Sequence, residues 1–139
     1  MSRIRSTGTR PEARLLALLQ AVLGKRAAIR LHAADLPGTP DAVVRSLRAA
    51  VFCDGCFYHW CPIHGHFPKS NRSYWLPKLR RNLRRDRASR RALGRRGYAV
   101  WRFWEHELRP RSFDRAANRL SRLVARRRIR LAGGGTLAK

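Results

Sequence analysis

The segment over residues 55–73 most constrains the fold, because it is rich in Cys, His, Pro and aromatic residues yet has neither helical nor strand periodicity. Something other than a packed core must therefore hold it. The spacing Cys56-x4-Cys61-x2-His64 places three soft or borderline ligands on this one loop, and His106 follows the last predicted strand. Zinc takes four such ligands in a tetrahedron. We predict a structural zinc site that orders the loop, the alternative being unliganded cysteines and surface histidines.

Three neighbouring residues bear on this prediction. His59 is three residues after Cys56 and could itself be a ligand, and His66 is a spare candidate for the third position. Cys53 falls inside a strand pattern, which favours a small core residue. An odd number of cysteines in a reducing compartment favours metal ligation over disulfide bonding.

The rest of the chain alternates between helical and strand periodicity. In chain order we expect a helix at 10–23, strands at 29–32, 41–44 and 48–53, a helix at 75–94, a strand at 98–104 and a helix at 112–128. The strands 41–44 and 48–53 are close enough in sequence to pair antiparallel. The pattern predicts an α/β domain, a mixed sheet flanked by helices, over residues 1–128. It would have an N-terminal arm at 1–9, the zinc loop at 55–73 and a flexible tail at 129–139.

The charge balance points to a polyanionic partner. The chain of 139 residues carries 32 Lys and Arg against 8 Asp and Glu, a formal net charge of +24. Nucleic acid is the leading candidate, since each neutralised phosphate releases counterions, and an anionic membrane surface is the rival. No apolar stretch approaches the roughly 18 residues that span a bilayer, and no signal peptide is recognisable. We therefore expect a soluble intracellular protein.

Carboxylates are scarce, so their positions are informative. Asp41 begins one predicted strand and Asp54 ends the next, so a hairpin would bring two hard oxygen ligands for Mg²⁺ to one end of the sheet. The alternative is that both are turn residues that bond to nearby backbone N–H groups. Glu12 fits the third helical position of a capping box. Asn82 and Asp86 are four residues apart and share one helix face.

Taken together, these residues lie in an ordered series of motifs that resembles the very short patch repair (Vsr-type) DNA mismatch endonucleases. The motifs are Leu36-Pro-Gly-Thr-Pro-Asp41, Val51 to His64, Pro68 to Trp75, Lys78, Asn82, Arg85-Asp86 and Trp104-Glu-His-Glu-Leu108. The resemblance covers roughly residues 2–109 and is far more specific than any one motif. It implies a restriction-endonuclease-like fold and a DNA strand-nicking activity at T:G mismatches.

The resemblance also implies roles at the catalytic centre. Asp41 would be the main Mg²⁺ carboxylate and the main-chain carbonyl of Cys53 a second metal contact. Asp54 as a further Mg²⁺ ligand is a hypothesis that rests on its place at the end of its strand and not on the resemblance. His59 would be the catalytic histidine that activates the attacking water, with Asp86 as partner of its imidazole. The positions close to the catalytic centre also include Glu12 and Asn82.

Further residues would hold zinc or contact DNA. The structural zinc would take Cys56, Cys61, His64 and His106. The aromatic side chains expected to enter the duplex beside the mismatch are Phe57, Tyr58 and Trp75, the alternative being ordinary core residues. The polar and basic residues expected to contact DNA are Lys69, Asn71, Arg72 and Lys78.

We therefore expect a Mg²⁺-dependent endonuclease with a structural Zn²⁺, leaving 5′-phosphate and 3′-OH ends and starting the repair of deaminated 5-methylcytosine. It would be a monomer of the bacterial cytoplasm, associated with the nucleoid, with other mismatch repair proteins as candidate partners, and without membrane attachment. Two alternatives are a non-catalytic zinc-stabilised nucleic-acid-binding protein and an RNA-binding basic protein. Composition alone does not separate the three.

Overall fold

The structure is a computed structural model in which residues 10–55 and 71–137 are described. A four-stranded sheet lies at its centre, with the strand order β1-β2-β3-β4. The strands are β1 (Ile29–Leu31), β2 (Ala42–Val44), β3 (Ala49–Asp54) and β4 (Ala99–Trp104). The first three pair antiparallel, whereas β3 and β4 pair parallel in a register that runs from Ala49↔Ala99 to Asp54↔Trp104. The predicted strands and the antiparallel 41–44/48–53 pair are thus confirmed.

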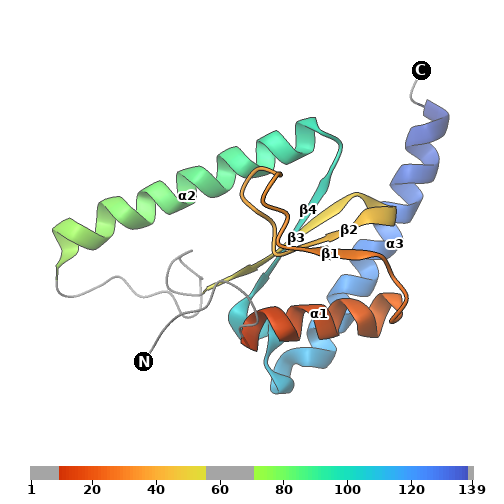
Figure 1. Cartoon of the computed structure of the whole chain (residues 1–139), viewed down its shortest axis with the longest axis horizontal. Helices are drawn as coiled ribbons and strands as arrows, with labels where there is room; N and C mark the ends of the chain where they lie inside the picture. The colour runs from red at the N-terminus through yellow and green to blue at the C-terminus, as the bar shows by residue number, and fades with distance from the viewer. Residues whose placement is uncertain (1–9, 56–70, 138–139) are drawn as a thin grey trace.

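Helices cover both faces of the sheet (Figure 1). The helices are α1 (Arg10–Leu23), α2 (Arg72–Arg95) and α3 (Phe113–Leu137). Strand β3 alternates between two cores: Val51 packs with residues of α1 and α3, and Phe52 packs with Leu93 of α2. A strand buried on both faces reads as a continuous apolar run, as Ala49–Cys53 does. This mixed α/β sheet with flanking helices is the architecture expected of a restriction-endonuclease-like fold.

Two helix boundaries differ from the prediction. Helix α2 begins at Arg72, so the loop predicted over 55–73 extends too far. The backbone N–H groups of Tyr74 and Trp75 both donate to the carbonyl of Asn71 at 3.0 Å, which fixes the first turn there. Periodicity missed this turn because its first residues are polar and exposed. The last predicted loop residue, Ser73, is therefore helical.

Helix α3 continues to Leu137, through the segment predicted as a flexible tail from residue 129. Residues 129–132 are Ile, Arg, Leu and Ala, which are ordinary helix formers, and no proline follows them. The run Gly133–Gly135 disfavours a helix by about 1 kcal/mol per residue but does not block it sterically. The glycine run was therefore the wrong signal for the end of this helix.

The edge strand β4 is covered on its open side by side chains. The carboxylate of Glu107 accepts a hydrogen bond from the backbone N–H of Trp104 (2.7 Å), and Arg119 donates to the carbonyl of Arg102 (2.6 Å). Glu107 and Arg119 also form an ion pair at 3.3 Å. Occupying edge groups in this way prevents a further strand from pairing there.

The turn before Asp41 depends on a glycine in the left-handed region, which gives the first testable prediction. Gly38 has φ +77°, and a Cβ there would lie 2.8 Å from Oγ and 2.9 Å from Cβ of Ser89 on α2. We expect Gly38→Ala to lower the free energy of unfolding by roughly 1–3 kcal/mol, from overpacking and backbone strain. Urea unfolding measures this.

Gly24, at the end of α1, is the matched control. Its φ is +96°, but nothing lies within 4 Å of the position of a Cβ. Gly24→Ala should therefore carry only the left-handed strain of about 1–2 kcal/mol. A Gly38→Ala effect no larger than that of Gly24→Ala would show that Ser89 yields and that the turn is not packed tightly against α2.

Candidate active site

Asp41 is held at the carboxyl end of β3. It directly precedes β2, and its Oδ2 accepts a hydrogen bond from the backbone N–H of Cys53 at 2.7 Å. Its own carbonyl accepts from the N–H of His32 at 3.1 Å. The Cys53 N–H therefore orients the carboxylate, and the bond from His32 fixes the backbone of Asp41.

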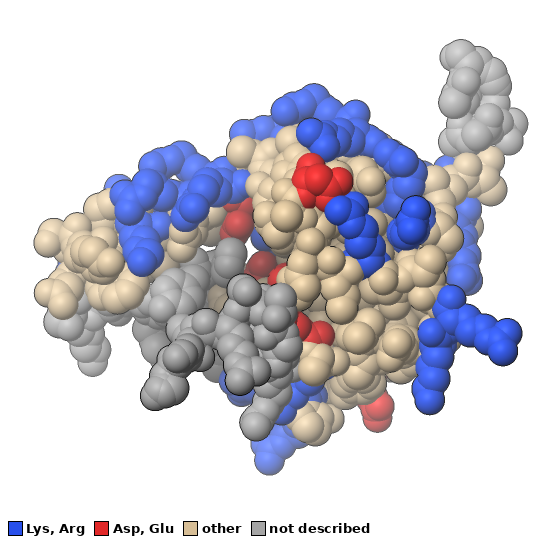
Figure 2. Space-filling model, viewed as in Figure 1, with Lys and Arg blue, Asp and Glu red and all other residues tan. Residues whose placement is uncertain are grey.

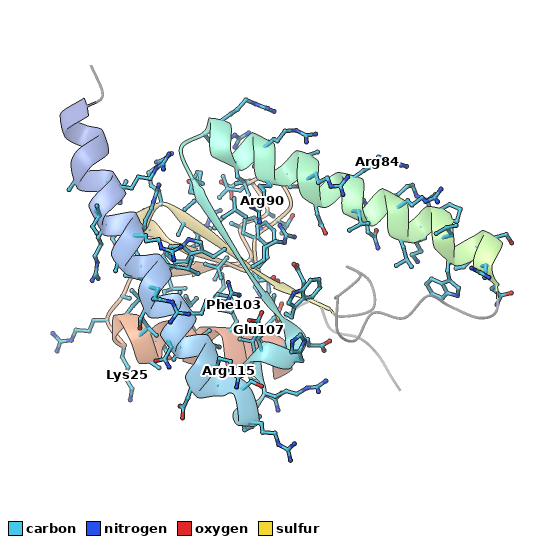
Figure 3. All side chains as sticks on the ribbon, turned by 180° about the vertical axis from the view of Figure 1, so that it is seen from behind. Lys25, Arg84, Arg90, Phe103, Glu107 and Arg115 are labelled. Carbon is cyan, nitrogen blue, oxygen red and sulfur yellow. The ribbon has the colours of Figure 1, made fainter. Side chains whose placement is uncertain are left out.

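A small cavity of about 210 Å³ opens in front of Asp41. It is lined by Pro11, Glu12, Asp41, Cys53, Gly55 and Glu105. The elements converge here because α1 begins next to the point where β4 ends (Figures 1 and 3). Three carboxylates from separate elements thus line one cavity, with Glu12 from the first turn of α1 and Glu105 directly after β4.

The electrostatic environment of Asp41 disfavours its negative charge. Burial raises the pKa of the Asp41 carboxyl, and the nearby charges of Glu12 and Asp54 raise it further. The hydrogen bond from Cys53 and the positive charge of His32 act in the opposite direction on this pKa. A half-buried carboxylate that lies near other carboxylates gains stability when a cation binds beside it.

Two residues near this cavity were not predicted. Glu105 immediately follows β4, which pairs parallel with β3, and the carboxyl ends of parallel strands meet, so its position is a signal only once that pairing is known. His32 places Nδ1 3.6 Å from Oε2 of Glu12 and adopts φ 53°, in the left-handed region. A single histidine after a three-residue strand gives no such signal in sequence.

Asp54 lies on the other face of the sheet. It is 5% exposed, and its carboxylate pairs with Arg102 on β4, with Nε 2.7 Å from Oδ2 and Nη2 3.3 Å from Oδ1. Arg102 also stacks over the ring of Phe52 at 4.1 Å. Asp54 does not line the cavity of Asp41, and its carboxylate is engaged in the ion pair with Arg102.

Asn82 and Asp86 lie together on α2, as predicted. Both line a second, larger cavity of about 570 Å³, whose other lining residues are Gly38, Thr39, Arg85, Ala88 and Ser89. Asn82 accepts a hydrogen bond from the guanidinium of Arg85, and Asp86 Oδ1 is 3.3 Å from Arg102 Nη2. The structure therefore groups this pair with the α2 face and not with Asp41.

Several predicted site residues lie outside the described residues. They are Cys56, Phe57, Tyr58, His59, Cys61, His64 and Lys69. Of the predicted zinc ligands, His106 is described, half-buried in the short 3₁₀ turn Glu105–Leu108. Within residues 10–55 and 71–137, no group of three or more His, Cys, Asp or Glu side chains is placed to hold a metal ion.

The amino end of α2 presents two aromatic rings and a cation. Trp75 is half-buried and meets Tyr74 edge to face at 5.0 Å between ring centroids. The Lys78 ammonium lies 5.5 Å from the Trp75 ring and 5.7 Å from the Tyr74 ring. Tyr74 is 59% exposed and was not singled out in the sequence, whereas Asn71 and Arg72 beside it were predicted and are exposed.

In the described part of the chain, no helix is both long enough and apolar enough to cross a membrane.

Comparison with known proteins gives a consistent result. The family model for "DNA mismatch endonuclease Vsr" matches residues 1–66. The type II nicking enzyme V.NaeI of Lentzea aerocolonigenes is 46% identical over 105 residues, 74% of this chain and 63% of the relative. The type II nicking enzyme V.XorIIP of Xanthomonas oryzae pv. oryzae is 44% identical over 110 residues, 78% of each chain. The DNA mismatch endonuclease Vsr of Escherichia coli is 37% identical over 116 residues, 80% of this chain and 70% of the relative. The chain therefore belongs to the Vsr family of DNA mismatch endonucleases.

Proposed function

We propose that this protein nicks one strand of duplex DNA at a T:G mismatch and so starts very short patch repair of deaminated 5-methylcytosine. The observation that carries the proposal is the cavity lined by Glu12, Glu105, Cys53 and the half-buried Asp41, whose carboxylate is held by the Cys53 N–H. A hydrolytic phosphodiester site needs such a place for a cation and the scissile phosphate. Two of the relatives above are named nicking enzymes, which supports a single-strand cut.

Mg²⁺ fits the donors at this cavity. Carboxylate and carbonyl oxygens are the ligands it prefers, and it is usually held by one or two carboxylates while keeping several waters and substrate phosphate oxygens. Asp41 and the main-chain carbonyl of Cys53 would hold it, with Glu12 and Glu105 in the surrounding shell. When bound, the ion would neutralise the charge that develops on the scissile phosphate.

The chain's own residues would then orient the reaction. The Cys53 N–H fixes the Asp41 side chain, so the entropy cost of ordering this side chain has been met before the substrate binds. We propose His59, which lies outside the described residues, as the base that takes the proton of the attacking water. As the water oxygen bonds to phosphorus, the P–O3′ bond would break and the leaving 3′ oxygen would take up a proton from solvent, giving 3′-OH and 5′-phosphate ends. Asn82 and Asp86 would act from α2, with Asp86 orienting the imidazole of His59.

Recognition of the mismatch would involve the amino end of α2. Tyr74 and Trp75 present aromatic rings beside the cation of Lys78, and Asn71 and Arg72 are exposed next to them. Aromatic side chains that enter between base pairs offset lost stacking, and mismatched steps open most easily. We propose that these residues contact DNA together with Phe57, Tyr58 and Lys69.

We further propose a structural zinc bound by Cys56, Cys61, His64 and His106, in a protein of the bacterial cytoplasm that acts on nucleoid DNA as a monomer. Elemental analysis of purified protein should find about one zinc per chain, as expected for one four-ligand site. Folded protein without zinc would overturn this assignment and leave the catalytic proposal untouched.

The central test uses labelled duplexes that differ only in T:G against C:G at one position, each incubated with Mg²⁺ and with chelator. We expect one nick, in the T:G duplex with Mg²⁺. Binding without cleavage in every arm would favour the non-catalytic binding protein. Preferential binding of RNA without nicking would favour the RNA-binding alternative.

The charge of His32 should influence the acid limb of the pH profile, the range in which the nicking rate falls as the pH is lowered. Its positive charge lowers the pKa of Asp41, and the ionised form of Asp41 is the one that can hold a cation. His32→Gln removes this charge, so the acid limb of the rate against pH should move to higher pH. The rate loss there should be about twofold, since a partly exposed pair contributes about 0.5 kcal/mol. His32→Lys keeps the positive charge, so its nicking rate should fall at the same acidic pH as that of the unsubstituted protein. The same shift in both variants would mean that the backbone geometry at φ 53° is responsible.

A further inference from the structure

A second cationic surface lies at the amino ends of β3 and β4, opposite the end that holds Asp41. Two open cavities meet there on either side of Tyr98. One, of about 500 Å³, is lined by Arg30, Val43, Arg45, Arg48 and Tyr98. The other, of about 560 Å³, is lined by Gly94, Gly97, Tyr98, Ala99, Trp101, Leu123, Arg126, Arg127 and Arg130. We call these residues the distal arginine surface.

Two of its arginines are fixed by contacts with backbone and ring. The guanidinium of Arg48 lies 4.6 Å from the centroid of the Tyr98 ring and donates to the carbonyl of Arg96 at 2.7 Å. Arg127 donates to the carbonyls of Leu47 and Gly97, both at 2.8 Å. These side chains are therefore held in place before any ligand binds, which lowers the entropy lost on binding.

The positive charge of this surface is poorly compensated by the chain itself. Among the described residues, no carboxylate lines either cavity, although Asp35 pairs with Arg30. Burial and the like charges of Arg130 and Arg48 lower the pKa of Arg127. Figure 2 shows Lys and Arg atoms gathered over the upper part of the face viewed and along its right side. An anion placed between these guanidinium groups would relieve their mutual repulsion.

The separation between the distal arginine surface and the catalytic cavity bears on which DNA segment could supply the anion. Strand β3 runs from Ala49 to Asp54, about 16 Å at 3.3 Å per residue, and separates the two sites. The catalytic cavity is at the carboxyl ends of β3 and β4 and the distal arginine surface is at their amino ends, so a straight duplex that lies across the carboxyl ends does not also lie on the distal arginine surface. Duplex DNA carries one phosphate charge per about 1.7 Å, which suits several arginines grouped on one surface.

We propose that the distal arginine surface binds the phosphate backbone of a second DNA segment, separate from the duplex at the catalytic cavity. The proposal rests on DNA being the substrate, as set out above. Its consequence is that one protein molecule can hold two DNA segments and so remain near a site after leaving it.

The test is capture of a second duplex, measured with Asp41→Asn protein so that nothing is cut. A T:G duplex of about 12 base pairs, about 40 Å long at 3.4 Å per pair, is immobilised and saturated with protein. A labelled matched duplex is then added and its retention is measured. Arg45→Gln with Arg130→Gln removes two exposed cations of the surface, and Lys25→Gln with Arg26→Gln removes two exposed cations that line neither cavity. Figure 3 places Lys25 at the end of α1.

We expect the Arg45/Arg130 pair to lower capture about tenfold and to reduce the salt slope of capture by about 2, while the Lys25/Arg26 pair changes capture much less. Nicking of the short T:G duplex by protein with Asp41 intact should be the same in all forms. Equal loss of capture in both pairs would overturn the proposal in favour of general charge attraction. Capture seen with a sedimentation mass of a dimer would overturn it in favour of two copies bridging two duplexes. Absence of nicking by the unsubstituted protein would instead count against the proposed function and leave the capture result standing.

Discussion

Asp41→Asn is expected to lower the nicking rate at a T:G mismatch by roughly 10³-fold or more, about 4 kcal/mol of transition-state stabilisation. Asparagine keeps the shape of the side chain, and its oxygen can still accept the hydrogen bond that the Cys53 N–H donates at 2.7 Å. What it loses is the negative charge on which cation binding depends. Single-turnover cleavage of labelled duplex measures the change.

Binding of the same duplex should change little, because phosphate contacts made elsewhere dominate the affinity. Asp114→Asn, at an exposed position in the first turn of α3, is the matched control and should nick normally. If Asp41→Asn protein nicked at a rate near that of the unsubstituted protein, the catalytic centre would have to lie elsewhere.

The same variant has a second, independent readout in stability. Burial raises the pKa of the Asp41 carboxyl above its ordinary value of 3.8, so the folded state binds this proton more tightly than the unfolded chain. The contribution of the protonated Asp41 to the free energy of unfolding is fully present below pH 3.8 and is lost as the pH rises through the folded-state pKa. Asp41→Asn should therefore melt at a higher temperature than the unsubstituted protein at neutral pH, and the difference should vanish in acid.

The contribution of Asp35 to stability should depend on pH in the opposite direction, which the same melting experiment can measure. The side-chain hydrogen bond from Arg30 lowers the pKa of this exposed carboxyl. Its contribution is present above pH 3.8 and is lost as the pH falls through the lowered pKa. Asp35→Asn should therefore not raise the melting temperature at neutral pH. Both variants shifting in one direction would show that removal of any carboxylate, and not burial of Asp41, controls the effect.

Local signals predicted most of the secondary structure. The left-handed glycine after α1, whose N–H donates to the carbonyl of Gln20 at 2.8 Å, marks the end of that helix in sequence and in space. The aromatic, β-branched run at 98–104 became β4. Its parallel pairing with β3 did not follow from any local pattern, because orientation depends on the path of α2 between the two strands. The predicted boundaries were wrong where helix propensity is weakest, in the polar first turn of α2 and at the glycine run of α3.

The candidate site was predicted only in part, because sequence patterns report local features and not the contacts between distant strands. Asp41 and Glu12 carry motif signals, and the structure places both in one cavity. Asp54 carried a signal of the same kind but faces the opposite side, since consecutive strand residues alternate and Cys53 takes the side of Asp41. Its partner, Arg102, is 48 residues away, and no spacing rule connects residues that meet through a parallel register.

Arg102 gives the largest expected loss of stability. Its side chain is 17% exposed and links Asp54, which is 7% exposed at the side chain, to Asp86 across the sheet and α2. Arg102→Met keeps an unbranched apolar side chain over the ring of Phe52 but leaves the buried carboxylate of Asp54 without its cation. Breaking a buried pair from one side typically destabilises by about 3–5 kcal/mol. We expect a loss in that range, measured by urea unfolding.

The controls for this loss separate a buried pair from a general effect of charge. Arg84→Met, on the exposed face of α2 in Figure 3, should change the free energy of unfolding by about 0.5 kcal/mol or less. Adding Asp54→Leu to Arg102→Met should recover part of the loss, because the uncompensated charge is then gone. A loss below about 1 kcal/mol in Arg102→Met would mean that solvent screens the pair as it does at a surface.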